Sequence, residues 1–215
     1  MTGPIGILGG SFDPVHFGHL RLAMECIEAA GLEKVLFVPL NIPAHREPLI
    51  ATAEQRKEML SLAVKNNHQF EISDIELKRK EVSYTIDTLQ VLREAYPNDS
   101  LCLIMGMDAF AHFDGWIQWQ HIPELANMII TNRPDSSHNV SNEKLNDLLR
   151  SRLTDDNTEL ANTPAGKIRT IDIPMLDISS TRIRQRIVQG KSIDYLLPDS
   201  VINYITIHKI YGQDK

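Results

Sequence analysis

The first residues that could do chemistry form the run Gly9-Gly10-Ser11-Phe12-Asp13-Pro14-Val15-His16-Phe17-Gly18-His19, which follows a short apolar segment. Its two leading glycines let the backbone approach a ligand closely. His16 and His19 are three positions apart, so in the first turn of a helix they point to the same side, and Gly18 removes a side chain between them. Two imidazoles placed in this way can donate hydrogen bonds to a phosphoryl group as negative charge builds on it. The glycine spacing fits neither a Walker A loop nor the dinucleotide fingerprint.

Two alternatives to a phosphate-binding role exist for the histidine pair. Capping or surface histidines are common, and two imidazoles can also serve as metal ligands. A metal site needs further His, Cys or carboxylate ligands at suitable spacing, and Asp13 is the only evident candidate nearby. We therefore predict no protein-held metal.

A second polar cluster lies far downstream, at Ser179-Ser180-Thr181, just before a helical pattern. These hydroxyls are good helix caps in their own right, which is the structural alternative to a ligand-binding role. Arg182 adds a delocalised cation suited to phosphate oxygens. Arg184 and Arg186 are expected to be solvated charges on the helix face, outside any site.

Apolar and helical patterns alternate along the chain. Apolar runs predict strands at 5–8, 35–38, 101–105, 128–131 and 168–173, and the segment 70–77 reads as a strand with an irregularity at Asp74. Helical periodicity predicts helices over 18–30, 52–64, 83–95, 180–189 and 198–209, with a Thr52–Gln55 capping box at the second. Nearly continuous apolar strands between helices predict an α/β, Rossmann-like, doubly wound, mainly parallel sheet with helices on both faces.

The chain is expected to be one domain over residues 1–215. The polar stretch 135–163 is predicted to be a surface insertion with an embedded helix, and residues 179–210 a C-terminal helical part. Ligands of such sheets bind beyond the carboxyl ends of the strands, where the first motif lies.

Composition excludes several classes of partner. The 215 residues carry 22 basic and 28 acidic side chains, a net charge of -6, which argues against a general nucleic-acid or anionic-membrane surface. Two cysteines without metal or redox spacing favour a reducing, cytoplasmic setting. No secretory signal and no apolar run long enough to span a bilayer is present, so no membrane association is expected. The oligomeric state is left open, a homo-oligomer included.

The opening motif, taken together with Ile178-Ser179-Ser180-Thr181-Arg182-Ile183-Arg184, resembles the signature of the nucleotidyltransferase superfamily. The resemblance narrows to the bacterial nicotinate-nucleotide adenylyltransferases through several further stretches: Pro43-Ala44-His45-Arg46, Ser83-Tyr84-Thr85, Met105-Gly106-Met107-Asp108, Trp116, 164–168 and 196–198. It covers essentially the whole chain. One departure is Ala44, where many members have proline.

The resemblance implies adenylyl transfer from ATP to nicotinate mononucleotide, giving deamido-NAD and pyrophosphate. It implies catalytic roles for His16, His19 and Arg182. It implies an ATP site that must unite the two distant motifs, made of Gly9, Gly10, Ser11, Phe12, His16, His19, Gly106, Asp108, Ile178, Ser179, Ser180, Thr181 and Arg182. Mg²⁺ would arrive with ATP, without a dedicated protein site.

The resemblance also implies a nicotinate mononucleotide site made of Ser11, Phe12, His45, Arg46, Ser83, Tyr84, Thr85 and Trp116. Free N–H groups at a helix start suit the pyridine carboxylate, and the indole offers a flat face to the ring. Taken alone, Asp108 could be a helix cap and Trp116 a core or interface residue. The alternatives are another adenylyltransferase, acting on nicotinamide mononucleotide or phosphopantetheine, or a non-catalytic nucleotide sensor.

Overall fold

The computed structural model describes residues 3–43, 49–79, 81–132, 140–174 and 176–212. The chain divides into two compact units, and neither is continuous in sequence. Unit 1 comprises Met1–Leu8, Ala23–Leu36 and Tyr84–Pro174, and unit 2 comprises Gly9–Leu22, Phe37–Ser83 and Met175–Lys215. The division falls within two strands and one helix, so each unit is assembled from segments far apart in the chain.

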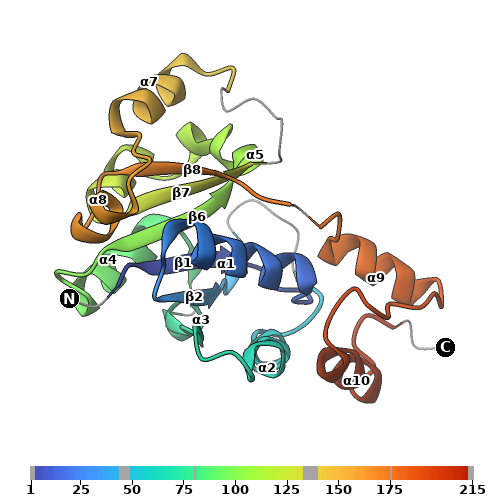
Figure 1. The fold of residues 1–215 in the computed structure, drawn as a ribbon. Helices are drawn as coiled ribbons and strands as arrows, with labels where there is room; N and C mark the ends of the chain where they lie inside the picture. The colour runs from blue at the N-terminus through green and yellow to red at the C-terminus, as the bar shows by residue number, and fades with distance from the viewer. Residues whose placement is uncertain (1–2, 44–48, 80, 133–139, 175, 213–215) are drawn as a thin grey trace. The chain divides into compact units, whose positions relative to one another are not determined.

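A six-stranded sheet carries the fold, in the order β4-β2-β1-β6-β7-β8 (Figure 1). Its strands are β1 (Ile5–Gly10), β2 (Lys34–Pro39), β4 (Phe70–Ile72), β6 (Leu101–Gly106), β7 (Asn127–Asn132) and β8 (Ile168–Asp172). The pairs β1–β6, β6–β7 and β7–β8 are parallel. The central strands are buried along most of their length, which is why they read as continuous apolar runs. The predicted α/β class with a parallel sheet flanked by helices is confirmed.

Unit 1 carries helices α4 (Thr85–Ala95), α5 (Met107–Phe110), α6 (Ile122–Leu125), α7 (Glu143–Arg152) and α8 (Asn157–Asn162), with short 3₁₀ turns η1 (Phe113–Gly115) and η2 (Trp119–His121). The segment 135–163, expected at the surface, contains α7 and α8. Leu145, Leu149 and Leu160 on these helices are buried. The Thr154 N–H donates to the Ile168 carbonyl of β8 at 2.8 Å, so the described part of this segment is tied to the edge of the sheet.

Unit 2 carries the first turns of α1 (Phe17–Ala30), then α2 (Ala53–Val64), α3 (Ile75–Arg79), α9 (Ser180–Val188) and α10 (Asp199–Ile207). A two-stranded parallel pair joins β3 (Ile42–Pro43) to β5 (Val82–Ser83). The predicted capping box begins α2, with the Thr52 hydroxyl accepting from the Gln55 N–H at 3.2 Å and the Gln55 side-chain oxygen from the Thr52 N–H at 2.9 Å. Helix α10 packs against α2, and the Ser200 hydroxyl donates to the Leu62 carbonyl at 3.2 Å.

The prediction of a strand over 70–77 is wrong beyond Ile72. β4 ends there, and α3 begins at Ile75. Asp74 explains the change, because its carbonyl accepts the Lys78 N–H at 3.0 Å while its carboxylate binds Lys57 and Lys78, each at 2.8 Å. The helix expected over 83–95 likewise begins at Thr85, since Ser83 pairs with β3. Within the described residues, no helix combines the length and apolar character needed to cross a bilayer.

Candidate active site

The glycine–histidine loop, residues Gly9 to His19, connects β1 to α1 within unit 2. A Cβ added to Gly9 would meet no atom within 4 Å, so open space lies beside the backbone there. A Cβ on Gly10 would instead crowd the Phe12 ring at 3.1 Å. Phe12 is fully buried with a positive φ of 48°, a strained conformation for an aromatic residue. The loop is thus folded tightly on one side and accessible at Gly9.

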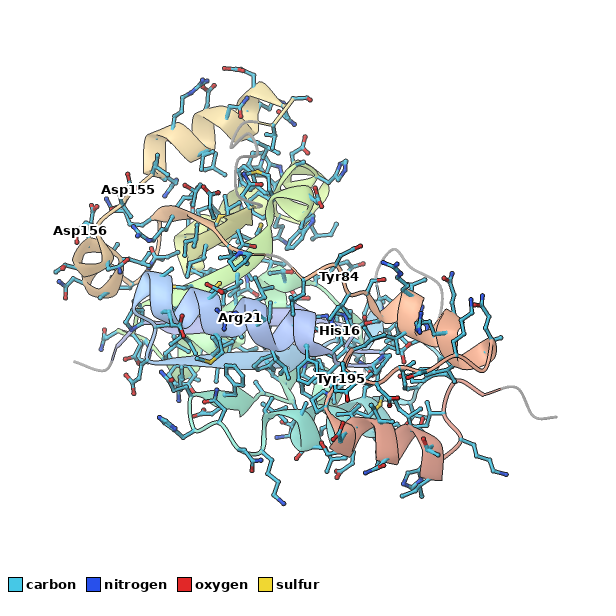
Figure 2. All side chains as sticks on the ribbon, turned by 45° about the vertical axis from the view of Figure 1, so that its right-hand side comes forward. His16, Arg21, Tyr84, Asp155, Asp156 and Tyr195 are labelled. Atoms are coloured by element: carbon cyan, nitrogen blue, oxygen red, sulfur yellow. The ribbon has the colours of Figure 1, made fainter. Side chains whose placement is uncertain are left out.

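The two histidines lie on the same side, as their spacing predicts. Their rings stack with centroids 3.8 Å apart and planes inclined by 27°, and His16 is at the loop end of α1 (Figure 2). A Cβ on Gly18 would come within 2.9 Å of both Cε1 and Nδ1 of His16 and within 3.4 Å of the Ile178 carbonyl oxygen. Gly18 therefore leaves room for the His16 ring, because an added Cβ would crowd it.

Both imidazoles are held in the neutral form. Burial lowers the pKa of His16 to about 4. Burial, aided by His16, also lowers the pKa of His19 well below its usual value. His19 Nδ1 accepts the backbone N–H of His16 at 3.3 Å, so the proton of the neutral His19 ring is on Nε2, where it can be donated. His16 Nδ1 is buried and has no hydrogen-bond partner among the described residues.

The start of α9 packs against this loop, also within unit 2. Ser180 donates its hydroxyl proton to the Pro14 carbonyl at 2.9 Å, and Arg184 donates to the Asp13 carbonyl at 2.7 Å. Ser179 is the N-cap and accepts from the Arg182 N–H at 3.3 Å. The two motifs that lie far apart in the sequence therefore meet in space. The Ser180 proton is already donated, whereas no group among the described residues accepts the protons of the Ser179 and Thr181 hydroxyls.

The expectation for one arginine at this helix start, Arg184, is wrong. Arg184 is not a solvated charge: its side chain is only 25% exposed and holds the Asp13 carbonyl. Arg182 has a side chain 64% exposed, paired with the exposed Asp177 at 3.1 Å. Arg186 is also anchored, donating from Nε to the Ser192 carbonyl at 2.7 Å. The sequence signal for Arg184 is its place one helical turn after Ser180, on the side of the helix that meets the loop.

A pocket of about 380 Å³ lies beside α9, also within unit 2. Its lining includes Ile178, Ser179, Arg182 and Leu196. The Leu196 carbonyl accepts the Phe17 N–H at 3.0 Å, so the loop before α10 reaches the start of α1. Tyr195, next to Leu196, is 91% exposed (Figure 2).

Unit 1 holds the predicted residues Gly106, Asp108, Tyr84, Thr85 and Trp116. Gly106, not Asp108, is the N-cap of α5, and Asp108 is exposed in its first turn. Tyr84 is the N-cap of α4, and its side chain makes no cap hydrogen bond to the N–H groups of that helix start. Trp116 is half-buried and packs edge-to-face on Phe113, with centroids 5.4 Å apart.

The remaining predicted residues are in the 37–83 segment of unit 2. Ser83 ends β5, and its hydroxyl accepts the Asn41 N–H at 3.0 Å. His45 and Arg46 lie outside the described residues. Within the described ranges, no three His, Cys, Asp or Glu side chains gather as metal ligands would.

Comparisons with known proteins show which family the chain belongs to. The cytidylyltransferase-like family matches residues 7–186. The chain is 44% identical over 207 residues to a probable nicotinate-nucleotide adenylyltransferase of Psychromonas ingrahamii, covering 96% of each chain. It is 39% identical over 214 residues to a probable nicotinate-nucleotide adenylyltransferase of Aeromonas salmonicida, covering 100% of each.

The fold is similar to that of a solved structure, Plasmodium falciparum nicotinic acid mononucleotide adenylyltransferase complexed with NaAD. The TM-score is 0.73 at 21% identity, with 97% of each chain covered. Sequence identity of about 40% over the full chain assigns the protein to one family. The chain belongs to the nicotinate-nucleotide adenylyltransferases, within the cytidylyltransferase-like nucleotidyltransferases.

Proposed function

We propose that the protein transfers the adenylyl group of ATP to nicotinate mononucleotide, producing deamido-NAD and pyrophosphate. The observation that carries this is the pair of neutral, stacked histidines beside the start of α9, in a chain whose full-length relatives are nicotinate-nucleotide adenylyltransferases. Nothing in the reaction requires a Ser or Cys nucleophile, because phosphoryl-type transfer depends on alignment and charge stabilisation.

ATP binds along the glycine–histidine loop. The open backbone at Gly9, the N–H groups at the start of the nine-residue helix α9 and the hydroxyls of Ser179 and Thr181 suit the triphosphate. Arg182, exposed and only loosely paired, exchanges Asp177 for phosphate oxygens. The other residues that we assign to the phosphate part of the ATP site are Gly10, Ser11, Phe12, His16, Ile178 and Ser180. We assign the ribose of ATP to Gly106 and Asp108.

In the transfer step, a phosphate oxygen of nicotinate mononucleotide attacks the α-phosphorus of ATP. The new O–P bond forms as the bond from that phosphorus to the pyrophosphate oxygen breaks. No proton need leave the nucleophile, which is already an anion. His19 Nε2–H donates to the phosphoryl oxygens as their charge increases, and the neutral ring keeps its proton throughout.

The pyridine carboxylate binds at the start of α4. Tyr84 leaves the N–H groups of this eleven-residue helix without a side-chain cap, and a carboxylate gains more from them than a neutral amide does. Trp116 stacks on the ring, while Ser83, Thr85, His45 and Arg46 contact the remainder of the nucleotide.

Mg²⁺ enters with ATP, held by phosphate oxygens and water. Asp13, the carboxylate of the loop, already accepts three hydrogen bonds, from the N–H groups of Ile50 and Ala51 and from the Tyr211 hydroxyl. The bound ion would supply charge neutralisation along the triphosphate.

The reaction belongs in a reducing compartment, and we place it in the cytoplasm. Cys26 and Cys102 are buried free thiols, and burial raises the pKa of each to about 12, so neither is poised to react.

The deciding experiment supplies Mg-ATP with either nicotinate or nicotinamide mononucleotide and measures pyrophosphate and dinucleotide. We expect a strong preference for the acid. Equal rates would exclude the carboxylate site at α4. Transfer to phosphopantetheine alone would support that alternative enzyme, and tight ATP binding with no pyrophosphate released for any acceptor would support a sensor.

A further inference from the structure

A buried carboxylate organises the glycine–histidine loop from within. Asp13 is 1% exposed, and its two carboxylate oxygens accept the backbone N–H groups of Ile50 at 3.0 Å and Ala51 at 3.1 Å. The phenol of Tyr211 donates a third hydrogen bond, to Oδ1, at 2.7 Å. A buried carboxylate is tolerated only where such donors are in place, so these donors determine where Asp13 and its neighbours in the loop lie.

Tyr211 comes from the far end of the chain. It follows α10 and is 6% exposed. Its φ of 66° lies in the left-handed region, which costs conformational energy for an aromatic residue. Its hydroxyl also lies 4.0 Å from the Met59 sulfur on α2. The chain therefore takes up a strained turn that leaves the phenol buried on Asp13.

Two arginines hold the same loop by its backbone. Arg56 of α2 donates to the Ser11 carbonyl at 2.9 Å, and Arg184 donates to the Asp13 carbonyl at 2.7 Å. Arg184 approaches the Asp13 carboxylate only to 4.0 Å. Among the described side chains, Tyr211 alone donates a hydrogen bond to that carboxylate, so its hydroxyl can be removed without touching the backbone contacts.

We propose that Tyr211 is a positioning residue for adenylyl transfer, acting through Asp13 on the loop that carries Phe12, His16 and His19. This rests on the proposed function. Asp13 lies three residues before His16, and a shift of the carboxylate moves the backbone that aims both imidazoles. In-line transfer is sensitive to such displacement, since about 1 Å of misplacement can cost about 100-fold in rate.

The test is Tyr211→Phe, with Tyr204→Phe as the matched control. The substitution keeps the ring packing and leaves Oδ1 of Asp13 with the Ala51 N–H, so the carboxylate is not left without donors. Tyr204 is on α10 in the same unit, where its ring lies on His208 with centroids 4.2 Å apart. We expect Tyr211→Phe to lower kcat about tenfold with each KM changed less than about twofold, and Tyr204→Phe to leave both constants unchanged.

Two further readouts separate positioning from stability. If Tyr211 acts through Asp13, Tyr211→Phe loses its effect on kcat in an Asp13→Asn background, to within about twofold. The ring resonances of His16 and His19 in the NMR spectrum move in Tyr211→Phe and stay in place in Tyr204→Phe.

An unchanged kcat with a lowered melting temperature would overturn the proposal, as would a full tenfold loss in the Asp13→Asn background. Loss of the folded circular dichroism spectrum in Tyr211→Phe would assign the residue to stability alone and overturn it as well. Failure of the proposed function is a different result, because the unmodified protein would then release no pyrophosphate with nicotinate mononucleotide.

Discussion

At the scale of single residues, one hydrogen bond selects the chemistry available to His19. Its Nδ1 accepts the His16 backbone N–H at 3.3 Å, which leaves the ring proton on Nε2. The lowered pKa keeps the ring neutral, so it donates a hydrogen bond without surrendering its proton. Such a donor acts most strongly on charge that develops during the reaction.

His19→Ala is expected to lower kcat by about 10²–10³-fold, the usual cost of losing one donor to developing charge. Steady-state pyrophosphate release measures it. His208→Ala, an exposed histidine at the end of α10, is the control and is expected to keep full activity. Full activity in His19→Ala would remove this residue from the mechanism.

Gly18→Ala tests the space beside His16. In most helices this change stabilises by about 0.5–1 kcal/mol. Here the new Cβ would lie 2.9 Å from the His16 ring, so we expect lower kcat and a lower melting temperature instead. Gly115→Ala is the matched control, because its Cβ would meet nothing within 4 Å. Comparable behaviour of the two variants would contradict the packing argument.

At the scale of elements, the docking of α9 on the loop joins the two motifs. Ser180 and Arg184 bind backbone carbonyls of Pro14 and Asp13, whereas Ser179 caps the helix. Sequence motifs that read as ligand contacts are therefore partly structural contacts. Within one helix turn, Ser180 and Arg184 hold the loop, whereas Ser179 caps its own helix.

Arg184→Gln and Arg182→Gln should differ accordingly. The first removes a half-buried donor to the Asp13 carbonyl, and we expect a lower melting temperature together with a reduced kcat. The second removes an exposed charge whose ion pair is worth at most about 1 kcal/mol, so we expect little change in stability and a higher KM for ATP. Thermal unfolding and ATP titration of the rate distinguish the two patterns, and identical profiles would count against this assignment.

At the scale of the whole molecule, the neutral histidines couple stability to pH. The pKa of His16 is about 4 in the folded protein, against 6.5 for an imidazole exposed to water. Between these values the unfolded chain binds more protons than the folded one, so stability rises with pH. The contribution of His16 to the free energy of unfolding is fully present above about pH 6.5. It is lost as the pH falls toward about 4, by up to about 1.4 kcal/mol per pH unit.

Urea unfolding at several pH values between about 4.5 and 7.5 checks this dependence. His16→Gln is expected to give a flatter dependence of the unfolding free energy on pH, because one such group is removed. His68→Gln, at an exposed position outside the site, should keep the original slope. Parallel curves for His16→Gln and the unmodified protein would show that His16 is not the coupled group.

Much of this arrangement could be predicted from the residues. The capping box at Thr52, the parallel strands and the proximity of His16 to His19 follow from local spacing and apolar pattern. The wrong predictions are also local in origin. The apolar pattern after Phe70 did not indicate the helix that starts beyond Asp74. Ile72 and Ile75 are three positions apart, and this spacing is compatible with both an interrupted strand and a short helix.

By itself, the sequence determined the class of fold, the two motifs and the chemistry their residue types allow, because those depend on side-chain type and spacing along a few turns. Only the tertiary structure decided which polar groups are already occupied. Ser180 and Arg184 are bound to loop carbonyls, and Tyr211 reaches Asp13 across 198 positions of sequence. Hydrogen bonds between distant segments leave no periodic trace in the chain, since they depend on how the folded segments meet.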